Sequence, residues 1–159
     1  MSDRSYRPCV LIALLNQDGQ VLVGERTDIK KPTWQLPQGG IEIGESTSKA
    51  AKREMREEIG TDNATLLKIS KRWITYDLPR ASRQNWMGNK WIGQKVRATA
   101  YLFNGTDADV NINTENPEFR AWRWEELETL PDLIVFFKRN LYRSVVSEFI
   151  QTRNQLRTA

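Results

Sequence analysis

Apolar runs separated by turn residues define the first part of the chain. Residues 9–16 are almost entirely apolar and predict a buried strand. Residues 17–20 have the composition of a turn and residues 21–24 predict a second strand, so we expect a hairpin. Residues 30–44 then contain two prolines and three glycines, which indicates a structured loop.

Two later segments have the pattern of helices. Residues 46–59 are rich in Ala, Glu, Lys and Arg, and Gly60 follows where glycine commonly ends a helix. From residue 132 to about residue 158, apolar positions recur every four residues, which predicts an amphipathic helix. These positions are Leu133, Phe137, Leu141, Val145 and Phe149.

Further strands are expected at residues 66–76, 91–103 and 119–124, with a turn at residues 104–107. Strands, a central helix and a terminal helix together predict an α/β fold in which helices cover a mixed sheet. The length of 159 residues suits one domain, residues 1–159, and no repeat or linker suggests a boundary.

Composition excludes several classes of chemistry. No run approaches the ~18–20 apolar residues of a membrane helix, and the N-terminal residues lack the apolar core of a signal peptide, so we expect a cytoplasmic protein. Cys9 is the only cysteine, so no internal disulfide is expected. The absence of histidine excludes Ser-His-Asp catalysis and histidine-bound zinc, which leaves acid–base work to Glu, Asp, Lys, Tyr or water.

The chain is basic, with a net charge of +4 and a pI of about 9.3. A basic surface raises the local concentration of polyanions such as nucleotides or RNA. The same charge could equally serve only solubility. Charge alone therefore does not identify a partner.

The helix at residues 46–59 gathers three carboxylates on one face. At about 100° per residue, Glu54, Glu57 and Glu58 fall within one arc of about 100°. Such a cluster repels itself unless cations neutralise it, and hard oxygen ligands suit Mg²⁺ or Mn²⁺. The alternative is a solvated acidic face with i,i+4 pairing, for instance between Arg53 and Glu57.

Two observations favour the metal interpretation over the solvated face. Lysine and arginine side chains (Lys49, Lys52 and Arg56) lie on a different face from the glutamates. A Gly-rich loop also leads directly into the helix, and such loops allow backbone to approach phosphates closely.

This loop and helix resemble the Nudix box, G-x5-E-x7-R-E-U-x-E-E-x-G-U, in which U is aliphatic. Thr61 at the last position is a mild departure. The resemblance implies an α/β/α sandwich, divalent metals held by Glu54, Glu57 and Glu58, and a brace formed by Glu45 and Arg53. It also implies that Gly39 and Glu118 belong to the metal site. The matching positions are Gly39, Glu45, Arg53, Glu54, Met55, Glu57, Glu58 and Gly60.

The resemblance extends over most of the chain, through segments such as residues 34–40, 91–95 and 136–139. These segments are similar to a Nudix subgroup that contains bacterial RNA pyrophosphohydrolases and plant-type dinucleoside tetraphosphate hydrolases. The implied partner is therefore 5′-triphosphorylated RNA, cut to 5′-monophosphorylated RNA, or diadenosine tetraphosphate, cut to ATP and AMP. A catalytically inactive module that binds nucleotides or RNA is the alternative of another class. We expect a monomer.

The same resemblance assigns roles in substrate binding. Arg7 and Arg26 would contact phosphates, although Arg26 could be ordinary surface charge. Tyr76, Phe137 and Lys138 would form a base-binding wall, and Lys95 would also contact substrate. Phe137 could instead be core, Tyr76 could be a strand residue with a satisfied hydroxyl, and Glu118 could be a loop glutamate.

The expected mechanism is attack of water on a polyphosphate that Mg²⁺ neutralises. Glu54, Glu57 or Glu58 could accept the proton from water, and we favour Glu57. One departure from the subgroup is Ala98-Thr99, where an aromatic pair is usual. This replacement puts the packing of the strand near the site in doubt.

Overall fold

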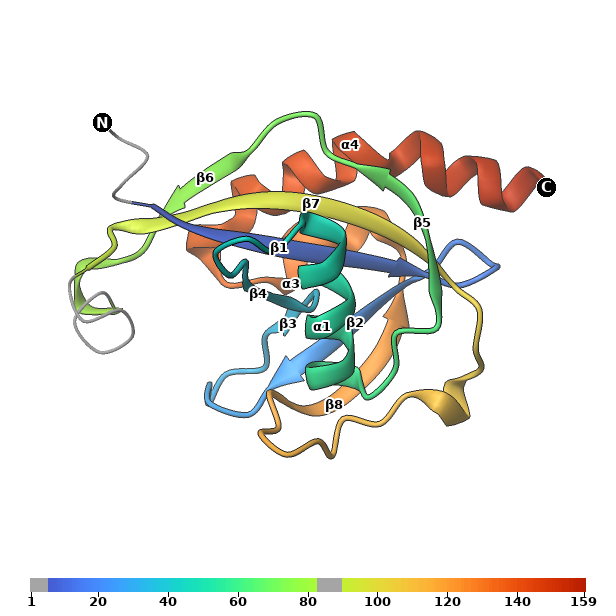
Figure 1. The fold of residues 1–159 in the computed structure, drawn as a ribbon, viewed down its shortest axis with the longest axis horizontal. Helices are drawn as coiled ribbons and strands as arrows, with labels where there is room; N and C mark the ends of the chain where they lie inside the picture. Colours follow the sequence, from blue (N-terminus) through green and yellow to red (C-terminus); the bar gives the residue numbers. More distant parts are fainter. Residues whose placement is uncertain (1–5, 83–89) are drawn as a thin grey trace.

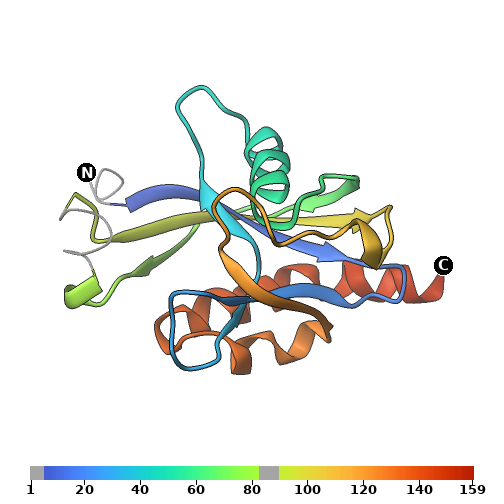
Figure 2. The same cartoon turned by 90° about the horizontal axis from the view of Figure 1, so that it is seen from below.

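A computed structural model describes residues 6–82 and 90–159 of the chain. Its strands form one mixed sheet, and helices cover both faces (Figures 1 and 2). This arrangement is the α/β/α sandwich that the sequence predicts. None of the helices in the described ranges is long and apolar enough to span a membrane. The strands are β1 (Tyr6–Leu15), β2 (Val21–Arg26), β3 (Trp34–Gln35), β4 (Gln38–Gly40), β5 (Ala64–Ile69), β6 (Ile74–Asp77), β7 (Gly93–Phe103) and β8 (Phe119–Glu125).

Strand β1 organises the sheet. It runs parallel to β7 along its whole length, from the pair Tyr6↔Gly93 to the pair Leu15↔Leu102. On its other side, β4 pairs with the first half of β1 and β2 meets only its end, which confirms the expected hairpin. Strand β2 then leaves β1 to pair with β3 and β8. The sheet therefore splits beside β4, and the glycine-rich loop enters at this split.

Helix α1 (Thr47–Ile59) begins and ends where local sequence signals predict. The Ser46 side chain caps the helix by accepting a hydrogen bond of 3.2 Å from the Lys49 amide. Gly60 ends it in the left-handed region, with φ of 73°. Ala51, Met55 and other apolar residues of α1 pack against the face of β1 that carries Val10, Ile12 and Leu14.

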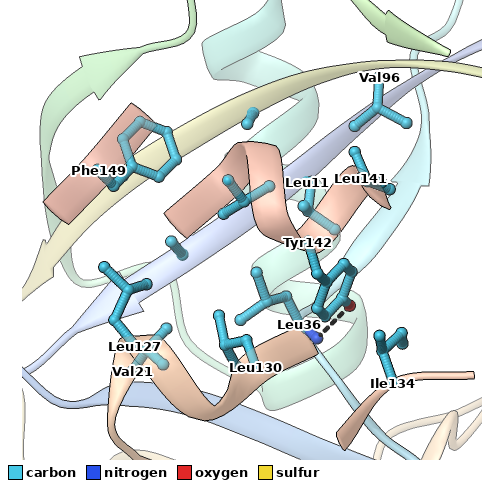
Figure 3. Packing of buried hydrophobic residues seen from close by; sticks show 14 of the residues in the cluster. Leu11, Val21, Leu36, Val96, Leu127, Leu130, Ile134, Leu141, Tyr142 and Phe149 are labelled. Carbon is cyan, nitrogen blue, oxygen red and sulfur yellow. Dashed lines mark hydrogen bonds between the residues drawn. The ribbon is translucent and has the colours of Figure 1, made fainter. Parts of the chain in front are cut away.

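Helix α4 (Arg139–Thr158) covers the opposite face of the sheet. Its residues Tyr142, Val145 and Phe149 pack against the alternate residues of β1, among them Leu11 (Figure 3). The Tyr142 hydroxyl accepts a hydrogen bond of 2.8 Å from the Leu36 amide, and both groups are buried. This bond ties α4 to the loop that leads into β4.

The prediction of one helix over residues 132–158 is wrong in its first part. Residues of this segment instead form the short helix α3 (Leu130–Leu133) and a 3₁₀ turn at Phe136–Lys138, before α4 begins at Arg139. Ile134 ends α3 because its ψ of 156° is extended. Phe137 therefore lies before α4. Two more 3₁₀ turns occupy Asp107–Asp109 and Leu127–Thr129.

The prediction of one strand over residues 66–76 also needs correction. The chain forms β5 and β6 with four residues between them, whereas β7 runs on without a break. Ser70 closes this excursion: its hydroxyl accepts from the Ala98 amide at 3.0 Å and donates to the Arg72 carbonyl at 3.0 Å. Strands 91–103 and 119–124 are confirmed as β7 and β8.

The small residues of β7 fit their positions in the core. Ala98 and Thr99 are fully buried and pair in register with Leu11 and Ile12 of β1. The Thr99 hydroxyl donates a hydrogen bond of 2.8 Å to the Leu11 carbonyl, so its burial leaves no donor unsatisfied. The replacement of the usual aromatic pair is thus accommodated inside the sheet.

Candidate active site

The carboxylates of α1 line a cavity of about 390 Å³ beside β4. Glu54 and Glu58 are buried, with 8% and 3% of their surface exposed, whereas the Glu57 side chain is 57% exposed. Glu118, which lies just before β8, reaches the same cavity. The structure therefore brings together all four glutamates that the sequence proposed as metal ligands.

Glycine at position 39 allows this arrangement. A β-carbon on Gly39 would overlap the carboxyl group of Glu54, because α1 lies directly over β4. A β-carbon on Gly40 would overlap the guanidinium of Arg7, which lines the same cavity. Two glycines in β4 thus let an acidic and a basic side chain approach the backbone.

Arg53 joins the loop to the helix. It donates two hydrogen bonds of 2.9 Å to Glu45, one of 2.7 Å to the Gly40 carbonyl, and one of 2.8 Å to Glu54. The contact expected between Glu45 and Arg53 is therefore present. Hydrogen bonding to Arg53 lowers the pKa of Glu45 to about 2.

Burial changes the protonation of the two inner glutamates. Desolvation raises the pKa of Glu54 to about 7, against the opposing hydrogen bond from Arg53. Desolvation also raises the pKa of Glu58 well above its ordinary value, and the nearby charges of Glu54 and Glu118 add to the shift. Glu58 accepts a hydrogen bond of 3.1 Å from the Gln38 amide. Ionised together, these groups require a compensating cation.

The donor set suits a hard divalent cation, since its acidic members are carboxylates whose charges repel one another. Within residues 6–82 and 90–159, three or more acidic side chains do not yet converge on one point. Glu54 is turned toward Arg53 and Glu58 toward the Gln38 amide. A bound cation would require these side chains to reorient.

Cationic side chains line the same cavity as the carboxylates. They are Arg7, Arg26 and Lys138. Lys138 is 3% exposed, and its Nζ lies 5.5 Å from the centroid of the Tyr76 ring. Burial, followed by repulsion from Arg26, lowers the pKa of Lys138 to about 8. Arg26 is held by Asp28, to which its Nε donates at 2.8 Å.

The aromatic residues expected to bind the base lie beside this cationic group. Tyr76 is 7% exposed, and its hydroxyl is hydrogen-bonded to Gln38 and Gln94. The Phe137 ring lies 6.2 Å from the Tyr76 ring and packs against the α4 side of the core. Phe137 also lines a second, more apolar cavity of about 390 Å³, which shares Arg26, Asp28 and Lys138 with the first. Phe137 thus contributes both to the core and to a cavity wall.

Lys95 is not brought into the cavity. Its neighbour Gln94 lines the cavity, and side chains alternate along β7, so Lys95 lies on the other face. There its Nζ is 5.3 Å from the centroid of the Trp73 ring.

Sequence reasoning missed four polar residues that line the cavity with the predicted ones. They are Asp28, Gln35, Gln38 and Gln94. Three of them lie inside segments that carried the family resemblance, and strand alternation could have selected Gln94 over Lys95.

The fold, the box of carboxylates and the glycine-rich loop together define a Nudix domain, and the chain belongs to the Nudix family. The NUDIX domain model matches residues 5–145. The chain is 49% identical to the RNA pyrophosphohydrolase of Rickettsia canadensis over 148 residues, which cover 92% of this chain and 91% of the relative. The RNA pyrophosphohydrolase of Rickettsia prowazekii is 48% identical over the same coverage.

Solved structures with this fold are more distant in sequence. The E. coli dihydroneopterin triphosphate pyrophosphohydrolase has a TM-score of 0.65 and 20% identity, covering 87% of this chain and 95% of that one. A C. elegans Ap4A hydrolase, solved as a binary complex, has a TM-score of 0.59 and 19% identity, covering 87% and 96%. These similarities support the fold.

Proposed function

We propose that this protein is an RNA pyrophosphohydrolase, which removes pyrophosphate from 5′-triphosphorylated RNA and leaves 5′-monophosphorylated RNA. The observation that carries the proposal is one cavity lined both by the carboxylates of α1 and by the cations Arg7, Arg26 and Lys138. A triphosphate needs such a pairing, because cations bind its charge while acids gather metal. The Rickettsia relatives support RNA as the substrate.

Glu54, Glu57 and Glu58, with Glu118 and Gly39, would hold Mg²⁺, for which Mn²⁺ or another divalent cation could substitute. When bound, the cation neutralises charge on phosphate oxygens and aligns the attacking water. Arg7, Arg26 and Lys138 bind the phosphates, and the Tyr76–Phe137 wall supports the first nucleoside. Glu45 and Arg53 hold the loop in place.

Glu57 is the best candidate for the general base in this cavity. Its side chain is 57% exposed, so water reaches it. Its contact with Arg53 is long, at 3.5 Å, whereas Glu54 is held at 2.8 Å and Glu58 by a backbone amide. Glu57 is thus free to accept a proton from the water.

The test incubates the protein with RNA labelled at its γ-phosphate in the presence of Mg²⁺. We expect labelled pyrophosphate from the wild type, and a loss of about 100-fold or more in Glu57→Gln, because general bases typically contribute 10²–10⁴-fold. Glu115→Gln is the matched control, since Glu115 is an exposed glutamate near the carboxylates of α1 but does not line the cavity that Arg7, Arg26 and Lys138 share with them. No release from the wild type, or equal release from Glu57→Gln, would reject the proposal.

Diadenosine tetraphosphate is the second candidate substrate. It is favoured by the apolar cavity that adjoins the first and shares Arg26 and Lys138 with it, because two cavities could accept two nucleosides. Comparison of kcat/KM for diadenosine tetraphosphate and for a short triphosphorylated RNA separates the two. Binding of both without turnover would indicate an inactive module. The expected monomeric state and cytoplasmic location stay predictions.

A further inference from the structure

An exposed tryptophan lies between two cations on the α1 side of the sheet, away from the catalytic cavity. Trp73 is 40% exposed. The centroid of its ring lies 5.3 Å from Lys95 Nζ and 5.5 Å from the guanidinium carbon of Arg97. We call Trp73, Lys95 and Arg97 the Trp73 surface.

Strand alternation places these side chains on one face. Val96 and Ala98 of β7 belong to the core on the α4 side, whereas Tyr101 belongs to the core on the α1 side. Lys95 and Arg97 share the parity of Tyr101, so they lie on the α1 side. Figure 1 shows β6 and the first part of β7 extending beyond α1, which covers the middle of this face. The Trp73 surface therefore lies on the part of this face that α1 does not cover.

A hydrogen bond fixes one cation of the Trp73 surface beside the indole ring. Arg97 Nε donates a hydrogen bond of 2.8 Å to the Ser70 carbonyl, which fixes the guanidinium beside the indole. Lys71 and Arg72, just before Trp73, are exposed and add positive charge. Two carboxylates lie nearby: Asp77 accepts a hydrogen bond of 2.6 Å from the Tyr6 hydroxyl, and Glu148 accepts one of 3.3 Å from the Lys71 backbone amide. Lys71, Arg72, Lys95 and Arg97 outnumber these two acidic groups, so the local balance is positive.

We propose that the Trp73 surface binds the single-stranded part of an RNA whose 5′ end occupies the catalytic cavity, an inference that rests on the proposed function. An exposed aromatic ring flanked by cations offers a base a stacking partner and phosphates their counter-charges. Among the described strands, β6 pairs only with β7, so its other edge is open. Leu78 and Phe137 line the second, more apolar cavity. An RNA that leaves this cavity would reach Trp73 by passing around the open edge of β6.

The choice of RNA over a small nucleotide follows from position. The Trp73 surface lies on the reverse side of the strands from Gln94 and Tyr76, so a ligand in the cavity cannot also touch it unless it continues as a chain. We expect dinucleotide substrates to end before this point. The surface should therefore matter only for substrates with several nucleotides.

The first test compares kcat/KM for a triphosphorylated dinucleotide and for an unstructured triphosphorylated dodecanucleotide. In Trp73→Ala and in Arg97→Gln we expect the value for the longer RNA to fall about 10-fold, the order of loss for one stacked base. The values for the dinucleotide and for diadenosine tetraphosphate should stay within about twofold of the wild type, since stacking stabilises only a base that reaches the Trp73 ring. Trp73→Phe keeps an aromatic ring and should restore most of the loss.

Arg123→Gln is the matched control. The guanidinium carbon of Arg123, on distant β8, lies 4.0 Å from the centroid of the Trp34 ring, so this arginine contacts an indole in the same way.

The second test measures fluorescence anisotropy of a dodecanucleotide that carries a 5′-hydroxyl and needs no turnover. Weaker binding in Trp73→Ala and Arg97→Gln, but not in Arg123→Gln, supports the surface. Unchanged affinity, or equal loss for both substrate lengths, overturns it. If the wild type hydrolyses no triphosphorylated RNA, the proposed function fails, and the anisotropy still reports on the surface separately.

Discussion

Arg53 holds both carboxylate oxygens of Glu45, at 2.9 Å each, across the turn that joins the glycine-rich loop to α1. The same guanidinium reaches the Gly40 carbonyl at 2.7 Å and Glu54 at 2.8 Å. One side chain thus fixes the loop, β4 and an inner carboxylate relative to one another. The planar fork of arginine suits this task, whereas an ammonium group cannot make parallel bonds.

Arg53→Lys should therefore lower kcat/KM by about 10- to 100-fold, the usual cost of disturbing a residue that orients metal ligands. Glu45→Gln should also lower kcat/KM. Steady-state kinetics across a Mg²⁺ titration measure the effect, which should include a higher Mg²⁺ requirement. Arg56→Lys is the control, since Arg56 is exposed and its ion pair among the described residues is with Asp62, just after the end of α1. Equal kinetics in Arg53→Lys and Arg56→Lys would contradict the bracing role.

The stability of the metal-free protein should fall as pH rises from about 4.5 to about 7. The pKa of Glu54 is about 7 in the folded state and 4.5 ordinarily, so the folded state binds this proton more tightly than the unfolded state. The resulting stabilisation is present below pH 4.5 and is lost as pH rises through about 7. Thermal unfolding at several pH values measures it.

Saturating Mg²⁺ should remove most of this pH dependence, because the cation, instead of a proton, then neutralises the Glu54 carboxylate. Glu54→Gln should make the metal-free profile flatter, since the amide does not ionise. A metal-free melting temperature that rises between about pH 5 and pH 8 would contradict the burial argument, which requires a cost for ionising Glu54.

Substrate affinity should weaken above about pH 8, where Lys138 loses its charge. Burial lowers the pKa of Lys138 to about 8, so this side chain is cationic below that pH and neutral above it. The KM for triphosphorylated RNA should rise with pH in the wild type. In Lys138→Met, the KM should be about 10-fold higher than in the wild type below pH 8, because a lost charge-assisted hydrogen bond typically costs ~1.5–3 kcal/mol. It should not rise with pH, so the two KM values should converge above pH 8. An identical pH profile in wild type and Lys138→Met would refute the phosphate role.

Tyr142→Phe should destabilise the fold by about 1–3 kcal/mol, the cost of a buried donor left unsatisfied. The variant removes the acceptor of the Leu36 amide, which lies at the start of the loop that leads to β4. Tyr101→Phe is a closely matched control, because the Tyr101 hydroxyl is buried and has no hydrogen-bond partner among the described residues. Urea unfolding should therefore leave Tyr101→Phe unchanged or stabilised. Equal losses in both variants would contradict the account of Tyr142.

Local signals explain which elements the sequence could predict. Helix α1 carries its own cap at Ser46 and its own stop at Gly60, so its ends follow from neighbouring residues. The break between α3 and α4 has no such signal, because Leu133 and Phe137 keep helical spacing although Ile134 is extended. The excursion between β5 and β6 depends on Ser70 bonding to distant Ala98.

The candidate site divides in the same way. The carboxylates of α1 lie close in sequence, so helical geometry alone brings them together. Asp28, Gln38 and Gln94 reach the cavity from three separate segments of the chain. Their proximity appears only once the sheet is assembled. Lys95 was assigned to substrate by its motif, yet alternation along β7 places it beside Trp73.

Isothermal titration calorimetry with Mg²⁺ tests the central claim most directly. The account predicts measurable divalent-cation binding to the wild type at neutral pH, strongly weakened in Glu54→Gln and in Glu58→Gln but not in Glu115→Gln. Circular dichroism should show that all of these variants are folded. Absence of binding to the wild type, or unchanged binding in both buried-site variants, would contradict the claim that these carboxylates gather the metal for pyrophosphate hydrolysis.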